Sequence, residues 1–264
     1  MELWQNGKVE FYHMPMKQYL FAVILSFLIS IPGQAELPGS FSAIYSLHFD
    51  DLRVGVMERH FIHKEDGSGT FESNGKLTGL AALFRKDQIN ETSRWEMKDG
   101  NLRPVVYKYE RTGGDSLKKE VHRFDWNKNT ISSVTETGKN KLPLKPGLLD
   151  KLLYQLAIMQ IKDPKAGLSY DLIDGTDLKN YQFEFMGEEE LSTPMGKLKS
   201  YKFQRKRDDQ NIKEGTKDTT QKIAKRSTII WCAPSLHYLP IRVDSIDKKG
   251  HLTSIIIKSV EGLN

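Results

Sequence analysis

The sequence predicts a mainly β protein of the α+β type, in which a strongly curved antiparallel sheet, or half-barrel, wraps around one central apolar helix. Three observations predict this fold. Apolar and polar residues alternate with a period of two over most of the chain, as in half-buried strands. Turn-forming residues interrupt the alternation at short intervals. One segment, 143–161, is apolar around most of its helical circumference, and such a helix must be buried.

Roughly eleven strands are expected over residues 41–135 and 168–260. The first of them places Phe41, Ala43, Tyr45, Leu47 and Phe49 on one face. Hairpin turns are expected at six places: Asp66-Gly67, Asp99-Gly100, Gly113-Gly114, Asn127 to Asn129, Pro194 to Gly196 and Lys249-Gly250. Strands joined by such short turns predict a meander of antiparallel hairpins.

The helix is expected to begin with Pro143 and Pro146 and to continue to Ile161. Because a chain of this length can bury it only by covering it with sheet, we expect the helix to lie on the concave face, in a single core. A division into two domains near residue 140 is an alternative, since the helix lies close to the middle of the chain.

Residues 16–35 have the features of a cleavable signal peptide. Lys17 precedes an uncharged, mostly apolar run from Tyr19 to Ile31, and Ala35 ends a small-x-small pattern. As a helix this run would rise roughly 20 Å, short of the roughly 30 Å hydrocarbon core, so no stable transmembrane span is expected after cleavage. We therefore predict a periplasmic protein with one domain over residues 36–264, and translation from Met16 with residues 1–15 as an extension.

Composition excludes some classes of protein. The net charge is +5, but bases and acids are interspersed, which argues against nucleic-acid binding. Cys232 is the only cysteine, so no intramolecular disulfide can form, and its apolar neighbours predict a buried, inert thiol. No cysteine follows the apolar run to carry a lipid anchor. Residues 206–227 are strongly polar and are expected to form a mobile loop between two strands.

Motifs for catalysis are absent from the sequence, which contains no nucleophile elbow, phosphate loop or dinucleotide fingerprint. Glu58 and His60 would share one face of a strand while His63 points to the other, so these residues do not predict a metal site. We therefore predict a protein that is not an enzyme and that has no cofactor and no metal. A hydrolase would require groups such as Glu58, His60 or His122 to converge in one cleft.

A short apolar segment, 78–87, is open to two interpretations. It can form a helical lid over the mouth of the curved sheet, or Leu80, Leu83 and Phe84 can plug one end of the core. Further along, two strands joined by a turn with two prolines are expected over 228–243. Together with the 143–161 helix these segments predict an apolar groove. Its candidate ligand-binding residues are Leu80, Leu83, Phe84, Leu149, Leu152, Leu153, Leu156, Trp231 and Tyr238.

Six blocks carry a resemblance to a known family: FSAIYSLHFDDLRVGVMER (41–59), TGLAALFRKD (78–87), LRPVVYKYERTGG (102–114), LPLKPGLLDKLLYQLAIM (142–159), LSTPMGKLKSYKFQR (191–205) and WCAPSLHYLPIRVD (231–244). In this order they resemble the bacterial family catalogued as domain of unknown function 3108. The resemblance implies an exported protein of Gram-negative bacteria and supplies no catalytic residues. At the level of the fold, a curved sheet enclosing a helix is similar to the periplasmic carriers of lipoproteins, although a fold does not fix a function.

The function predicted first is therefore a non-enzymatic periplasmic binding module for a lipid-like or other apolar ligand. One alternative is an envelope structural or interaction protein whose core is filled. A second alternative is an envelope hydrolase. A hollow interior favours the first prediction, and a solid one favours the structural protein. The sequence predicts no oligomeric state.

Overall fold

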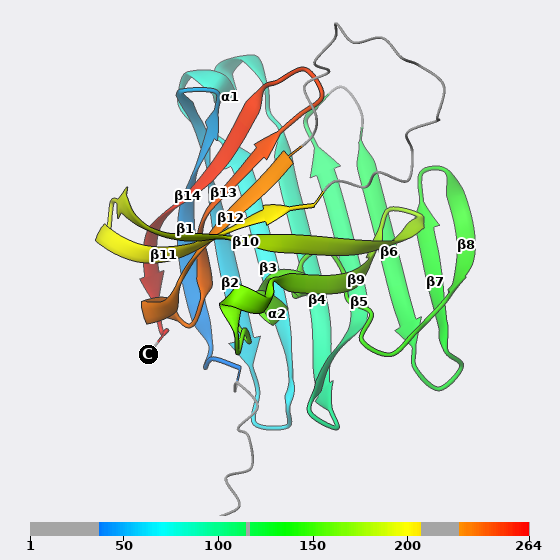
Figure 1. The fold of residues 1–264 in the computed structure, drawn as a ribbon. Coiled ribbons are helices and arrows are strands. Elements are labelled where there is room, and N and C mark those ends of the chain that lie inside the picture. Colours follow the sequence, from blue (N-terminus) through cyan, green and yellow to red (C-terminus); the bar gives the residue numbers. More distant parts are fainter. Residues whose placement is uncertain (1–36, 115–116, 207–226, 264) are drawn as a thin grey trace, which may run out of the picture. The chain divides into compact units, whose positions relative to one another are not determined.

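The computed structural model describes residues 37–114, 117–206 and 227–263. This part of the chain is mainly β, as predicted, and its fourteen strands form one antiparallel sheet that does not close (Figure 1). The strands are β1 (Phe41–Phe49), β2 (Leu52–His63), β3 (Ser68–Leu77), β4 (Gln88–Lys98), β5 (Asn101–Thr112), β6 (Lys118–Asp125), β7 (Thr130–Thr135), β8 (Gly138–Pro143), β9 (Leu168–Asp174), β10 (Asp177–Thr193), β11 (Gly196–Arg205), β12 (Ser227–Ala233), β13 (Leu239–Ile246) and β14 (Leu252–Glu261). The helices are α1 (Leu80–Phe84), α2 (Leu153–Ile158) and the 3₁₀ turns Pro164–Ala166 and Pro234–Leu236.

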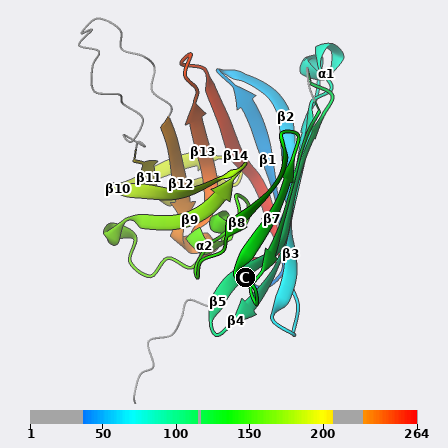
Figure 2. The same ribbon diagram turned by 90° about the vertical axis from the view of Figure 1, so that its right-hand side faces the viewer.

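Two runs of hairpins make up the sheet and meet in its middle. One run goes from β1 outward to the edge strand β8, and the other goes from β14 outward to the edge strand β9. Antiparallel pairing of β1 with β14 joins them. Figures 1 and 2 show β9 and β10 crossing in front of β3 to β6, so that the second run curls over one face of the first. We call this inner face the concave face.

The predicted turns fall where strands are joined, with Gly196 of one turn already beginning β11, and this confirms the hairpin pattern. Asp99 and Gly100 join β4 to β5 with φ angles of 51° and 73°. Positive φ at both positions suits the twist of a two-residue hairpin, and Asp and Gly are among the residues that tolerate it.

The first strand departs from simple alternation. Phe41, Ala43 and Tyr45 are buried as predicted, but Phe49 is exposed. Register shifts in the pairing of β1 lie between Ile44 and Tyr45 on one side and between Leu47 and His48 on the other. Because each irregularity changes which face the following side chains occupy, the far end of the strand does not follow the period of two.

The predicted helix over 143–161 is wrong in extent. Pro143 ends strand β8, the chain from Leu144 to Leu152 is irregular, and only Leu153–Ile158 is α-helical. Gly147 has a φ of 79°, which is far from helical geometry. The segment is rich in leucine because an irregular chain that is buried on most sides needs apolar side chains in every direction. Its composition is therefore the same as that of a buried helix.

The core is filled by that segment, which lies between the two runs of the sheet (Figure 2). Leucines of residues 144–156 pack with Phe71 and Trp95 of the first run and with Trp231 and Ile241 of the second. A smaller cluster around Phe183 and Phe203 continues the core beneath β10 and β11.

The predicted signal peptide over 16–35, the start at Met16 and nearly all of the predicted loop over 206–227 lie outside the described residues. Among the described helices none is long and apolar enough to cross a membrane.

Candidate functional site

The most exposed large apolar side chains of the described residues gather at one end of the sheet. Leu80, Leu83 and Phe84 of α1 are 77%, 77% and 86% exposed, and Leu52 at the start of β2 is 72% exposed. Residues 80–84 of the 78–87 segment form a short helix, and the interpretation that these side chains plug the core is wrong because all three are exposed. Five residues of helix offer too narrow a face to bury three large side chains.

Both ends of the α1 segment are attached to the sheet. The N–H of Thr78 donates to the carbonyl of Val54 at 2.9 Å. Asp87 accepts from Arg85 and from Arg111 of β5, at 2.7 Å and 2.6 Å. Hydrogen bonds from Arg111, supported by Arg85, hold the pKa of Asp87 below its usual value. These contacts anchor the α1 segment to the sheet, so its exposed apolar side chains lie on a fixed part of the surface.

A groove of about 570 Å³ runs between α1 and the start of β2. Its volume is within the range of small-molecule sites, roughly 300–1,000 Å³. Arg53 lies in its wall and Lys86 follows α1, and neither forms an ion pair within the described part of the chain. The groove residues are Leu52, Arg53, Val54, Thr78, Gly79, Leu80, Ala81 and Phe84.

The other predicted groove residues lie elsewhere and are not brought together with α1. Leu149, Leu152, Leu153 and Leu156 are buried in the main core, with relative exposures of 5% or less. They pack against other apolar side chains and do not form the floor of an open groove.

Trp231 and Tyr238, the predicted groove residues of the second run, also lie in packed surroundings. Trp231 is buried in the main core, and its indole N–H donates to the carboxylate of Glu189. Tyr238 is half-buried beside Tyr201, with ring centroids 5.8 Å apart. Cys232 is fully buried as predicted, and burial raises the pKa of its thiol.

A row of polar side chains crosses the concave face next to the apolar core. Ser93, Tyr107, His122 and Ser133 are directly paired across β4, β5, β6 and β7, and all four are buried. The ring of His122 stacks on that of Tyr107 with centroids 5.7 Å apart. Such a row is unusual in a core, because buried polar groups cost free energy unless they are satisfied.

Asp150 and Lys151 from the irregular segment complete this layer. Ser93 Oγ donates to Asp150 Oδ2 at 2.6 Å. Lys151 Nζ lies 3.5 Å from Glu120 Oε2 and 3.5 Å from Asp174 Oδ1, so it bridges the two runs of the sheet. The contact with His122 and the charge of Lys151 hold the pKa of Glu120 below its usual value, although burial acts in the opposite direction.

The titratable residues considered for a hydrolase do not converge. Glu58 and His60 alternate with the buried Arg59 and Phe61, so they lie on the opposite face of β2 from the core. His122 is on the concave face of β6. Within residues 37–114, 117–206 and 227–263, no three His, Cys, Asp or Glu side chains are placed to hold a metal ion.

Sequence reasoning missed the polar layer. Its members fall at inward positions of separate strands, and only the register between those strands brings them together. One signal was present in β4, where Glu91, Ser93 and Trp95 alternate with outward residues. Two polar residues on the inward side of a strand that also carries a tryptophan indicate a mixed interior.

An open, single-sheet β protein with a filled core is the class that the fold and these surfaces define. The chain belongs to the family described as protein of unknown function DUF3108, whose sequence model matches residues 44–256. The predicted family is thereby confirmed. No curated protein matches the chain.

Two solved structures are similar to the chain. One is a beta-barrel-like protein of domain of unknown function DUF1849 from Brucella abortus, with 9% identity, a TM-score of 0.48, and coverage of 85% of this chain and 98% of that one. The other is described as a "putative lipoprotein" from Parabacteroides distasonis, with 9% identity, a TM-score of 0.34, and coverage of 85% and 96%.

Proposed function

We propose that the protein is an exported, periplasmic and non-enzymatic binding module that takes a lipid-like ligand at its α1 end. The observation that carries the proposal is the gathering of Leu52, Leu80, Leu83 and Phe84, each more than 70% exposed, beside one groove. Exposed apolar side chains that lie together mark sites of interaction. The signal-like segment over 16–35 supports the periplasmic location.

The charge of Arg53 at the groove favours an anionic amphiphile. Arg53 would meet a negatively charged head group, while the apolar residues of α1 contact acyl chains. Apolar burial supplies the affinity, at about 25 cal/mol per Å², and Arg53 adds an attraction that salt weakens. The proposed site at α1 replaces the predicted interior groove, because the leucines of that groove form part of the packed core.

A vesicle-binding experiment tests the proposal. Replacing Leu80, Leu83 and Phe84 together by Gln should reduce binding to phosphatidylglycerol-containing vesicles at least fivefold in a flotation assay. Stability should change by no more than about 1 kcal/mol, because the three side chains are exposed. Met186→Gln is the matched control, since Met186 is exposed on β10, outside the groove. Equal flotation of the triple variant and the control would contradict the proposal.

A second candidate, an envelope interaction protein, is favoured by the filled core. In that case the same exposed residues contact a protein rather than lipid. Two results together would support this candidate. The wild type would bind no vesicle, and the triple variant would lose an envelope protein that cross-links to the wild type.

A further inference from the structure

The outer face of strands β4 to β8 carries a patch of positive charge. Arg94 and Arg123 directly follow Ser93 and His122 of the buried polar layer, so they lie on the opposite side of the sheet from that layer. All the cations of this patch are exposed. We call them the basic face, which consists of Arg94, Lys108, Arg123, Lys139 and Lys141.

The register of the strands sets these five side chains in two adjacent rows. One row runs through directly paired residues from Arg94 on β4 to Arg123 on β6 and Lys141 on β8. The other row runs in the same way from Lys108 on β5 to Lys139 on β8. Because neighbouring strands are about 4.8 Å apart, cations two strands apart are separated by roughly 10 Å, and the basic face spans roughly 20 Å.

Within the described part of the chain, none of the five cations forms an ion pair. Carboxylates lie two residues further along β5 and β6, but each has a lysine of its own. Glu110 pairs with Lys119 at 2.6 Å, and Asp125 pairs with Lys128 at 3.2 Å. These carboxylates therefore do not neutralise the basic face.

Three further carboxylates lie at its margins. Glu96 is directly opposite Arg103 in the pairing of β4 with β5. Glu136, beyond the end of β7, accepts the backbone N–H of Lys119. Glu72 of β3 is paired with Thr92 and limits the patch to strands β4 to β8. The positive charge is thus left for a partner outside the chain.

The spacing of the cations indicates what kind of partner fits. One guanidinium fork matches one carboxylate or phosphate group, whereas charges roughly 10 Å apart meet separate groups. The partner must therefore carry several negative charges over about 20 Å, as an anionic surface or polymer does. The two rows contain no aromatic side chain on which nucleic-acid bases could stack. Their other members on β4 to β7 are Thr92, Val106, Val121, Ser132 and Val134.

We propose that the basic face holds the protein against an anionic lipid surface. Clusters of Lys and Arg are attracted to anionic leaflets, and each residue adds to the attraction. The α1 segment leads into β4, and the row that contains Lys108 crosses β4 at Thr92, four residues after Gln88. This distance is roughly 14 Å along the strand, so a bilayer on the basic face would lie close to the α1 groove.

The basic face is separate from the α1 groove, and none of its residues lines that groove. The choice of a lipid surface over another polyanion rests on the proposed function, in which the groove takes a lipid-like ligand. The basic face would then hold the protein at the surface from which this ligand comes.

Binding to vesicles tests the proposal. At low salt the wild type should bind vesicles that contain phosphatidylglycerol at least tenfold more tightly than vesicles of phosphatidylcholine alone. Replacing Arg94, Lys108 and Arg123 together by Gln should weaken binding to the anionic vesicles at least tenfold, since each basic residue at an anionic leaflet contributes roughly fivefold. Wild-type binding should fall to a similar extent in about 1 M salt, where the screening length is about 3 Å.

Two further variants separate charge from structure. Replacing the exposed Lys162, Lys165 and Lys249 together by Gln removes the same charge from other parts of the surface and should leave binding within about twofold of the wild type. Replacing Arg94 and Arg123 by Lys keeps the charge and should retain binding. If the triple Gln variant of the basic face does not fold, Lys108→Gln and Arg123→Gln should each weaken binding roughly fivefold.

Uptake of a dispersed short-chain phosphatidylglycerol, measured without vesicles, reports on the α1 groove alone and should not change in the basic-face variant. Failed uptake by the wild type, together with vesicle binding that depends on the basic face, would contradict the proposed function and support the lipid surface. Normal uptake, together with equal vesicle binding by the wild type and the basic-face variant, would overturn the role of the basic face alone. Binding of the wild type to heparin but to no vesicle would overturn the lipid surface and assign the face to a soluble polyanion.

Discussion

Asp150 is the residue that attaches the irregular segment to the sheet. Its Oδ1 accepts the N–H groups of Leu152 and Leu153 at 2.9 Å and 2.7 Å, and its Oδ2 accepts from Ser93. Burial raises the pKa of this carboxyl from 3.8 to about 6, although the three donors act against burial. Since the folded pKa is the higher one, the contribution to stability is complete below about pH 4 and is lost as the pH rises through 6.

Asp150→Asn should therefore change how stability depends on pH. The amide keeps an acceptor for the backbone N–H groups but cannot ionise. The free energy of unfolding of the variant, relative to the wild type, should increase by about 2 kcal/mol between pH 4.5 and pH 7.5. Urea denaturation of both proteins at the two pH values measures this difference. A difference that stays constant with pH would show that the carboxyl does not titrate in this range.

The burial of a single residue could be predicted from the sequence where its neighbours along the chain leave only one plausible environment. Cys232, between Trp231 and Ala233, is buried as its apolar neighbours predict. Sequence reasoning did not identify Arg59, His122 and Ser133 as buried, because their burial depends on pairing between separate strands. Hydrophobic alternation shows that a position faces inward, but it does not show whether the neighbouring inward positions are polar.

At the scale of elements, the 144–158 segment explains both the main success and the main error of prediction. Its burial follows from its leucines, and that part is confirmed. Its conformation does not follow, because Pro143, Pro146 and Gly147 prevent a continuous helix while an apolar composition remains compatible with a buried irregular chain. Leu149 even pairs with Leu172 of β9 through backbone hydrogen bonds, as a strand residue would.

Leu152→Ala tests whether this segment fills the core or forms the floor of a ligand groove. Leu152 is fully buried among apolar neighbours. Truncation in a packed core removes apolar contacts and leaves a cavity, so it should destabilise the protein by about 3 kcal/mol. Chemical denaturation measures the loss. Leu80→Ala, at an exposed position, should cost less than about 1 kcal/mol. Similar small losses in both variants would indicate that residue 152 faces open space.

At the scale of the whole molecule, the curved antiparallel sheet was predictable because period-two alternation and turn residues are local signals. The order of the strands was not, since no local pattern specifies that β1 pairs with β14. Strand β8 was also missed, because its sequence, Gly138 to Pro143, is almost wholly polar and lacks the alternation of a half-buried strand.

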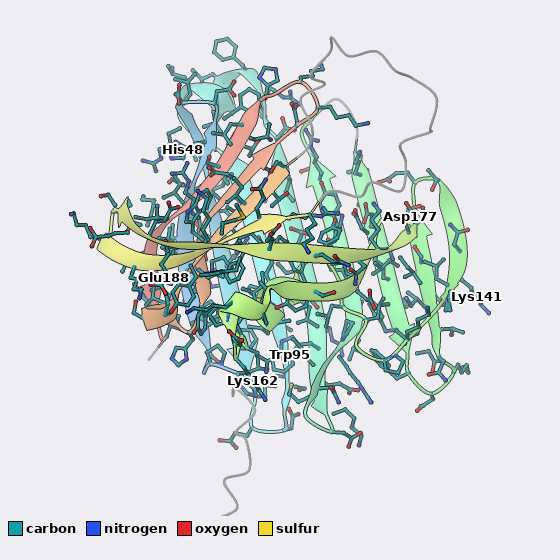
Figure 3. All side chains as sticks on the ribbon, in the orientation of Figure 1. His48, Trp95, Lys141, Lys162, Asp177 and Glu188 are labelled. Carbon is teal, nitrogen blue, oxygen red and sulfur yellow. The ribbon has the colours of Figure 1, made fainter. Side chains whose placement is uncertain are left out.

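The two edges of the open sheet are protected in different ways. The edge strand β9 is partly covered by Leu149, which accepts from the N–H of Ile173 and donates to the carbonyl of Asp171. The edge strand β8 carries exposed lysines at 139 and 141, and Figure 3 places Lys141 at this edge of the sheet. Lysines on an edge strand discourage pairing with another sheet.

Replacing Lys139 and Lys141 together by Val should therefore make the protein associate with itself through β8. Light scattering coupled to size-exclusion chromatography should show larger species that increase with concentration. Lys108→Val is the matched control, because it adds an exposed apolar side chain on β5, which is paired on both sides. Equal association of the control would attribute the effect to hydrophobicity alone, and no association of the double variant would contradict the role of these lysines.

The pairing of β1 with β14 has a consequence for how the chain folds. Within the described strands, twelve of the thirteen ladders join neighbours in sequence, and only this one joins opposite ends, with Ser42 beside Glu261. Hairpins can form in succession during synthesis, but distant pairings form slowly because closing a long loop costs entropy. Until β14 arrives, β1 presents an unpaired edge at what becomes the centre of the sheet, so a chain stalled before residue 252 is the form most exposed to misassembly.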